Sequence, residues 1–390
     1  MLLVELIAFL ACATWLYLIV GRGGFWLATE RDDGGHAEHN PPLASWPRVT
    51  AVVPARNEAA CIAASIGSLL AQDYPGRFDV VLVDDDSTDG TAEIARRVAT
   101  AAENGRFTVI EGRPLPVGWT GKLWALKQGI ETAEASPMRP EYLLLTDADI
   151  VYAPDTLRML AAKAETSTLV LASLMAKLRC DSAAERGLVP AFIFFFQMLY
   201  PFAWVNRPYT TTAAAAGGCM LVRADALWRA GGVERIRTAL IDDCALARVM
   251  KAQGPIWLAL TERVRSIRPY PRVDDIRQMV ARSAYAQLRY SPLLLAGCIL
   301  GMGLTYLAPP VLALFANGLA SWLGFAAWAL MALAMLPTLR FYRVSPLWSI
   351  ALPAIASLYV LFTLDSAYAS ARGRGGLWKG RAQASPSEAP

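Results

Sequence analysis

The sequence has few of the side chains that most acid–base catalysts and metal centres use. Its two histidines, His36 and His39, lie in a polar segment rich in glycine and aspartate. Its six cysteines are scattered, with no CxxC pair, and two of them fall in apolar segments. These scarcities argue against histidine chemistry, a zinc site and a disulfide framework, and they predict a reduced compartment. Acid–base chemistry must then come from carboxylates.

Charged residues are also scarce, at 18% of 390 residues against 55% hydrophobic. Soluble domains contain about 25% charged residues, so part of this chain is predicted to lie in lipid. The net charge of +4 comes without a dense basic run, which argues against a nucleic-acid partner. Basic residues gather near the apolar segments, which favours contact with a membrane surface.

Long apolar runs divide the chain. Residues 2–20 can cross the hydrocarbon core, which needs roughly 20 residues. The run lacks a basic n-region and a cleavage site, so we expect a retained anchor rather than a signal peptide. Three further spans are predicted, and Pro309-Pro310 makes the first of them the candidate for a re-entrant segment. The predicted domains are an anchor (1–21), a linker (22–47), an α/β domain (48–292), C-terminal membrane helices (293–366) and a basic tail expected to be disordered (367–390).

Between residues 48 and 270, strand and helix patterns alternate. The repeated βα units predict a mostly parallel sheet with helices on both faces. The stretch 188–204 is apolar and aromatic but short for a span, and a buried core helix and a surface dipping into the bilayer fit it equally. The expected strands are 49–53, 80–83, 107–110, 142–146 and 169–175, and the expected helices are 58–70, 91–101, 121–133 and 155–164.

Acidic residues end two of the apolar strands, where ligands of parallel sheets bind. Three carboxylates in Asp84-Asp85-Asp86 repel one another unless they are solvated, hydrogen-bonded or near a cation. Asp147 and Asp149 have one small residue between them, so they can share Mg²⁺ or Mn²⁺ and meet a diphosphate. The alternative for the first cluster is a capped turn, and the DxD pattern alone occurs often by chance.

Four other segments carry candidate residues. Pro54 ends a strand and Glu58 opens a helix whose N–H groups can meet an anion, or the segment is a capped loop. Lys122 follows a tight turn and either contacts phosphate or is solvated. Asp242 and Asp243 begin a helix, as caps or as a general base. A later segment with Arg277, Gln278, Arg282, Gln287 and Arg289 either clamps a diphosphate or anchors at lipid headgroups.

The order PARNE, VDDDSTDGT, DAD, GGCMLVR, IDD and an Arg-rich segment resembles the family 2 glycosyltransferases with the GT-A fold, over roughly residues 49–292. The WTGKLWAL stretch, the one-plus-three layout of spans and the RxxxxxxRYSP ending are similar to the ceramide glucosyltransferase branch. The overall likeness, including RGGFWLA after the anchor, is closest to the hopene-associated glycosyltransferases of bacteria.

This resemblance implies a Rossmann-like nucleotide-diphospho-sugar transferase domain with one N-terminal and about three C-terminal transmembrane helices. It implies an inverting enzyme of the hexosyltransferase type that moves a sugar from a nucleotide-sugar, usually a UDP-sugar, to a lipid acceptor, with a hopanoid as the specific candidate. The implied cofactor is Mn²⁺ or Mg²⁺. The implied location is the bacterial inner (cytoplasmic) membrane, multi-pass, with the catalytic domain facing the cytoplasm.

The resemblance also assigns roles. Asp85 matches the acid that reads the uracil, Asp243 the catalytic base, and Arg282 the arginine that supports the departing nucleotide. The other matched residues are Pro54 and Glu58 beside Asp85, Asp147 and Asp149 at the metal, and Asp242 beside the base.

Two departures from the family pattern matter. Asp86 replaces the usual glycine, which adds charge near the base pocket. Gln278 stands four rather than three before Arg282, and Ser283 replaces the usual tryptophan. The missing tryptophan and the few spans argue against a processive synthase. A polyprenyl-phosphate glycosyltransferase and a non-catalytic nucleotide-binding membrane scaffold also fit these motifs.

Overall fold

The computed structural model describes residues 2–33, 43–102, 105–373, 377–378 and 381–382. The two histidines, and most of the tail expected to be disordered, lie outside them. The chain forms two compact units, each described by itself below. Unit 1 comprises Met1–Thr29, Cys180–Ala203 and Pro269–Gly375, and unit 2 comprises Glu30–Arg179, Trp204–Arg268 and Gly376–Pro390.

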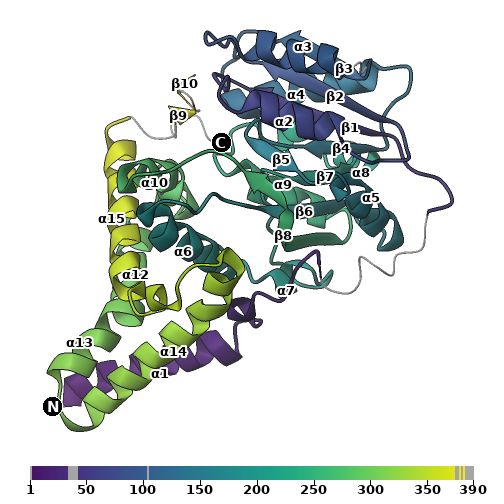
Figure 1. Ribbon diagram of the computed structural model, residues 1–390. Coiled ribbons are helices and arrows are strands. Elements are labelled where there is room, and N and C mark those ends of the chain that lie inside the picture. The colour runs from purple at the N-terminus through teal and green to yellow at the C-terminus, as the bar shows by residue number, and fades with distance from the viewer. Residues whose placement is uncertain (1, 34–42, 103–104, 374–376, 379–380, 383–390) are drawn as a thin grey trace. The chain divides into compact units, whose positions relative to one another are not determined.

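Unit 2 is built on an eight-stranded sheet in the order β3-β2-β1-β4-β7-β6-β8-β5 (Figure 1). Strands β3, β2, β1 and β4 pair in parallel, as the βα pattern predicts. Beyond β4 the sheet is mixed, because β7 runs antiparallel to β4 and β6, and β5 runs antiparallel to β8. The strands are β1 (Val49–Ala55), β2 (Phe78–Asp84), β3 (Phe107–Glu111), β4 (Tyr142–Leu145), β5 (Ile150–Tyr152), β6 (Leu171–Lys177), β7 (Met220–Arg223) and β8 (Ile256–Ser266).

Helices cover both faces of this sheet. Helix α3 has the bounds that the sequence predicts, whereas α2 begins at Ile62 rather than at Glu58. The chain turns before α2 because Asn57 adopts a left-handed conformation, with φ 51°, which asparagine tolerates. The elements are α2 (Ile62–Leu70), α3 (Thr91–Ala101), α4 (Gly121–Ala135), α5 (Thr156–Thr166), α7 (Phe202–Val205, at the unit boundary), α8 (Ala224–Arg229), η2 (Val233–Ile236), α9 (Asp242–Lys251), β9 (Leu377–Trp378) and β10 (Arg381–Ala382).

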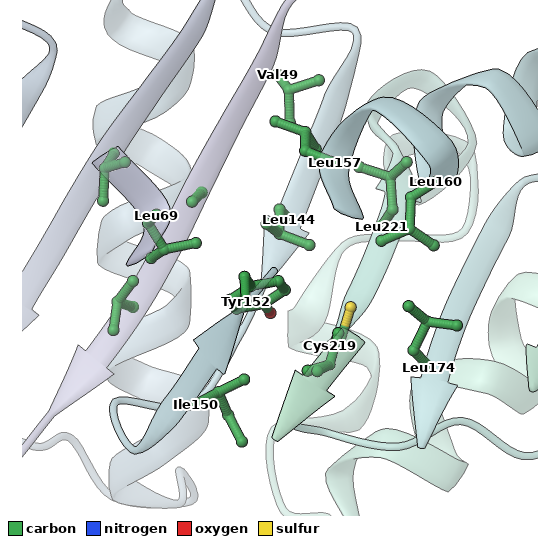
Figure 2. Close-up of a cluster of buried hydrophobic side chains, with 14 of the residues drawn as sticks. Val49, Leu69, Leu144, Ile150, Tyr152, Leu157, Leu160, Leu174, Cys219 and Leu221 are labelled. Carbon is green, nitrogen blue, oxygen red and sulfur yellow. The ribbon is translucent and has the colours of Figure 1, made fainter. Parts of the chain in front are cut away.

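A hydrophobic core lies on the sheet face that α2 and α5 cover (Figure 2). Leu69 of α2 and Leu160 of α5 are fully buried against strand residues such as Leu144 and Leu221. Each such side chain stabilises the fold by roughly 2 kcal/mol relative to its exposed state. The core therefore fixes the strands whose carboxyl ends carry the acidic residues.

The opposite sheet face packs against α4. Val81 and Val83 of β2 point to this side with Ala125, since alternate strand residues face opposite ways. Gly129 lets the helix approach closely, because a Cβ there would lie 2.4 Å from Cγ1 of Val52. This contact fixes the helix that begins with the Lys122 turn.

Unit 1 is helical. Five helices of the described chain are long and apolar enough to cross a membrane: Leu2–Val20, Ala183–Val205, Pro292–Phe315, Gly318–Tyr342 and Leu352–Ala371. The expectation of one N-terminal and about three C-terminal helices is therefore confirmed, with one addition. The elements are α1 (Leu2–Val20), η1 (Phe25–Leu27), α6 (Ala183–Leu199), α10 (Val273–Ala281), α11 (Ala284–Gln287), α12 (Pro292–Met302), η3 (Gly303–Leu307), α13 (Ala308–Phe315), α14 (Gly318–Tyr342), η4 (Pro346–Ser349) and α15 (Leu352–Ala371).

The added helix, α6, packs against α10, α14, α15 and η1 within unit 1. Phe195 makes edge-to-face contacts with Tyr306 and Tyr359, 5.6 and 5.1 Å between ring centroids. Arg22 donates hydrogen bonds to the carbonyls of Met198 and Leu199 at the end of α6. Residues 188–199 of the apolar stretch thus lie in α6, which packs within unit 1 and is also long and apolar enough to count among the helices that could cross a membrane.

The prolines of the first C-terminal span do not end its helix. A π-helical turn over Gly303–Leu307 precedes Pro309-Pro310, and the helix then continues to Phe315. Proline lacks an N–H donor, so a local change of hydrogen-bond spacing is expected there.

Candidate functional site

Two loops at the carboxyl ends of β1 and β2 are joined by side-chain hydrogen bonds. The backbone N–H of Asn57 donates to Oγ of Ser87 at 3.0 Å, and that of Thr88 donates to Oδ1 of Asn57 at 2.9 Å. The N–H of Glu58 donates to Oγ1 of Thr91 at 2.8 Å. The polar residues of the STDGT turn therefore bind the neighbouring loop and fix its position.

Asp85 lies buried at this junction, beside the end of β1. Its side chain is 1% exposed, and its N–H donates to the carbonyl of Ala55 at 2.8 Å. The guanidinium of Arg56 lies 3.8 Å from Oδ2 of Asp85 and donates to the Asp85 carbonyl. Arg56 stands inside the PARNE motif, but sequence reasoning passed over it. Pro54 is buried in register with Val83.

Asp86, which replaces the glycine usual in the family, has a backbone conformation that glycine favours. Asp86 has φ 60°, the left-handed region that glycine takes without strain and that aspartate tolerates. Its carboxylate is 70% exposed and lies 3.5 Å from Nη1 of Arg56. The added charge is therefore largely solvated.

Lys122 bridges two carboxylates that are far apart in the sequence. Its Nζ lies 2.8 Å from Oδ1 of Asp147, just after β4, and 3.0 Å from Oδ2 of Asp242, at the start of α9. Thr120 caps the helix that presents it, accepting from the N–H of Leu123. Burial opposes the charge on Lys122, but the two carboxylates more than offset burial and raise its pKa. Burial raises the pKa of Asp147, and the positive charge of Lys122 offsets part of that rise.

Asp243 stands beside this bridge with both oxygens held. Oδ2 accepts from the N–H of Gly217 at 3.0 Å, and Oδ1 accepts from the N–H of Cys244 at 2.7 Å. Burial and the neighbouring Asp242 raise the pKa of Asp243 to about 6. Such a carboxylate is ionised at neutral pH yet basic enough to accept a proton.

Gly217 leaves little room for a side chain in this centre. A Cβ at this position would lie 3.3 Å from Nζ of Lys122 and 3.6 Å from Oδ2 of Asp243. This glycine was noted in the sequence only as part of the GGCMLVR motif. Its N–H donor to Asp243 was not predicted.

Asp149 has different partners from Asp147. Its Oδ2 accepts from Oγ of Ser266 and from Nε of Arg268, each at 3.0 Å. The pairing of β5 with β8 places Ile150 opposite Ser266 and so directs Asp149 to that strand. The expectation that Asp147 and Asp149 share one cation stays a prediction; the carboxylates that converge on one cationic group here are those of Asp147 and Asp242.

The acidic centre fits a divalent cation by its donor chemistry. Asp147, Asp242 and Asp243 outnumber the single ammonium of Lys122, and carboxylate oxygens are the ligands that Mg²⁺ and Mn²⁺ prefer. The Lys122 ammonium stands in for a cation between two of them. Within the described part of the chain, no three His, Cys, Asp or Glu side chains form a ready-made metal cluster.

Arg282 belongs to unit 1, where it caps the end of α10 and is exposed. On the same helix, Gln278 donates to Asp274 at 2.6 Å, and Arg277 pairs with Asp274 and with Asp365 of α15. Arg277 thus anchors α10 to an apolar helix, and the role expected for Arg282 stays a prediction.

Comparison with known proteins identifies a domain that carries the residues of the β1 and β2 loops, Lys122, Asp147 and Asp149. Residues 50–231 match the family model described as glycosyl transferase family 2. The chain carries a family 2 glycosyltransferase domain. The family 2 match includes Asp85, Lys122, Asp147 and Asp149 and ends before Asp243.

Two curated relatives and one solved structure resemble parts of the chain. Glycosyltransferase AglE of Haloferax volcanii is 41% identical over 59 residues, 15% of this chain and 19% of that protein. An N-acetylglucosaminyltransferase of Mesorhizobium japonicum is 28% identical over 151 residues, 38% of this chain and 33% of that protein. The chain thus matches at most a third of either relative's length.

The solved structure is a mannosyltransferase, PcManGT, of Pyrobaculum calidifontis in complex with GDP-Man and Mn²⁺. The two structures match with a TM-score of 0.54 at 21% sequence identity, over 97% of this chain and 100% of the mannosyltransferase chain. At this identity the likeness establishes the fold alone. The GT-A fold predicted from the sequence is therefore confirmed.

Proposed function

We propose that this protein is a membrane-bound inverting glycosyltransferase that moves a sugar from a nucleotide-sugar to a lipid acceptor. The observation that carries the proposal is the partly buried centre in which Lys122 joins Asp147 to Asp242, with Asp243 held beside them. Asp243 supplies a basic carboxylate and Lys122 a cationic group that suits a diphosphate, and the match to family 2 includes Lys122.

The proposed donor site lies between the β1 and β2 loops and the acidic centre. Asp85, with Pro54 and Glu58, would bind the nucleobase, and a UDP-sugar is our first choice of donor. The Pyrobaculum neighbour binds GDP-Man, so a GDP-sugar is the second choice. Lys122 would contact the diphosphate, and Arg282 would support the departing nucleotide.

The proposed chemistry is a single displacement. Asp243 accepts the proton of an acceptor hydroxyl while the two backbone N–H groups of Gly217 and Cys244 hold its carboxylate in place. Mn²⁺ or Mg²⁺, held by Asp147 with Asp149, would supply charge neutralisation at the leaving diphosphate. Displacement by the hydroxyl from the face opposite the leaving group inverts the anomeric carbon.

The apolar helices favour a lipid acceptor. Five helices of the described chain are long and apolar enough to cross a membrane, which favours an acceptor that resides in a bilayer. By resemblance, a hopanoid alcohol is the proposed acceptor. We also propose the bacterial inner membrane as the location, with the family 2 domain facing the cytoplasm.

The test is sugar transfer by the full-length protein in lipid. Radiolabelled UDP-sugars and GDP-sugars are supplied with Mn²⁺ or Mg²⁺, and with a hopanoid alcohol, a polyprenyl phosphate or neither. Asp225→Asn is the matched control, because Asp225 is an exposed acid paired with Arg229 outside the acidic centre. Label on the hopanoid, lost in Asp243→Asn and kept in Asp225→Asn, supports the proposal.

Two different outcomes would replace the proposed function. Label on the polyprenyl phosphate, with only a mild loss in Asp243→Asn, would change the acceptor, because a phosphate nucleophile needs little help from a base. Nucleotide binding without transfer from any donor would favour a non-catalytic scaffold.

A further inference from the structure

One guanidinium in unit 2 contacts two acids of the proposed donor site. Arg268 donates from Nε to Oδ2 of Asp149 at 3.0 Å, and from Nη2 to Oε1 and Oε2 of Glu58 at 2.6 and 2.7 Å. Glu58 and Asp149 are each 8% exposed. Buried carboxylates need such a partner, because an unpaired buried charge is costly.

The contact joins three segments that are remote in the sequence. Glu58 lies in the loop between β1 and α2, Asp149 between β4 and β5, and Arg268 just after β8. The backbone N–H of Ile267 donates to the carbonyl of Asp149 at 3.0 Å, and Ser266 donates to the same carboxylate oxygen as Arg268. The end of β8 therefore sets the position of Asp149.

We infer that Arg268 couples nucleotide binding at Glu58 to divalent-cation binding at Asp149. Both donors meet Oδ2 of Asp149, which leaves Oδ1 for a cation, as supporting hydrogen bonds commonly orient metal-binding carboxylates. Any displacement of Glu58 by a bound nucleotide passes through the rigid guanidinium to Asp149. The inference rests on the proposed function and adds a positioning residue that lies outside the family 2 match.

To couple Glu58 to Asp149, Arg268 must hold both carboxylates in fixed directions, which a positive charge alone does not do. The planar guanidinium reaches two carboxylates from fixed directions, whereas a lysine ammonium is a single point charge on a flexible stem. Coupling between two ligands is reciprocal, so the cation must tighten nucleotide binding as much as the nucleotide tightens cation binding. Arg268→Lys should therefore keep the charge and lose the coupling.

The experiment measures UDP and GDP affinity by calorimetry, with and without Mn²⁺, on full-length protein. In the wild type we expect Mn²⁺ to tighten nucleotide binding by about tenfold or more. In Arg268→Lys and Arg268→Gln that ratio should fall below about threefold, while affinity without Mn²⁺ changes less than about threefold. Arg265→Gln is the matched control, because Arg265 lies on β8, is 63% exposed and pairs with Glu262.

The outcomes separate the inference from the proposed function. If Mn²⁺ tightens nucleotide binding in Arg268→Lys as much as in the wild type, charge alone is enough and the inference is overturned. If it does so in Arg268→Gln, Arg268 does not couple the two ligands and the inference is again overturned. An equal loss in Arg265→Gln would also overturn it. If Arg268→Gln does not fold, Arg268→Lys decides. Wild-type protein that binds neither nucleotide would contradict the proposed function itself, and the inference with it.

Discussion

Replacing Lys122 by methionine removes the ammonium that lies between Asp147 and Asp242 while keeping most of the apolar stem. The Lys122 side chain is 16% exposed, and its Nζ lies within 3.0 Å of both carboxylates. Breaking a buried ion pair from one side costs about 3–5 kcal/mol. Asp147 is 36% exposed, so solvent screens part of this loss and we expect about 2 kcal/mol. At about 3 °C per kcal/mol, the melting temperature should fall by about 6 °C.

The assay is thermal unfolding of the full-length protein with and without Mn²⁺. A divalent cation replaces the missing charge, so Mn²⁺ should restore about half of the loss in Lys122→Met. Lys127→Met is the control on the same helix, because Lys127 pairs with the more exposed Glu131 and Glu234 and should cost under about 1 kcal/mol, independently of Mn²⁺. Equal melting of Lys122→Met and wild type, or no greater effect of Mn²⁺ on the variant, would refute the reasoning.

Three more predictions follow from the same structure. Asp243→Asn should lower sugar transfer more than about 100-fold while donor binding, measured by calorimetry, persists; equal losses of both would contradict a base. Burial raises the pKa of Glu134 from 4.5 to about 7, so ionisation costs stability as pH rises through that window. Glu134→Gln should therefore stabilise the protein at pH 8, by about 1 kcal/mol after screening, and not at pH 4. Asp86→Gly should leave the melting temperature nearly unchanged and Asp86→Val should lower it, because φ is 60°; equal melting of the two would show that this backbone conformation relaxes.

Local patterns were enough to predict the parallel half of the sheet. Apolar runs with polar turns after them placed β1, β2 and β4, and helix α3 has the expected bounds of Thr91–Ala101. These elements depend on neighbours in the sequence, where hydrophobic period and turn residues carry the information. The sequence alone therefore predicted that acidic residues stand at the ends of these strands.

The pairings of the site could not be predicted in this way. Strand β8 runs antiparallel to β5, which places the end of β8 beside Asp149, and Arg268 after β8 also reaches Glu58 in the β1–α2 loop. Lys122 likewise meets Asp242 from more than a hundred positions away. Such contacts depend on the register of distant segments, which a single sequence does not encode locally. The left-handed conformations of Asn57 and Asp86 could not be predicted either, because most asparagine and aspartate residues have a negative φ.

The most direct measurement is transfer of labelled sugar from UDP-sugars and GDP-sugars to a lipid extract, with Mn²⁺, by wild type, Asp243→Asn and Asp225→Asn. We expect label in the lipid phase with wild type and Asp225→Asn, and none with Asp243→Asn. Label that persists in Asp243→Asn at the wild-type rate, or that never enters lipid with any donor, would contradict the proposal that this acidic centre glycosylates a lipid.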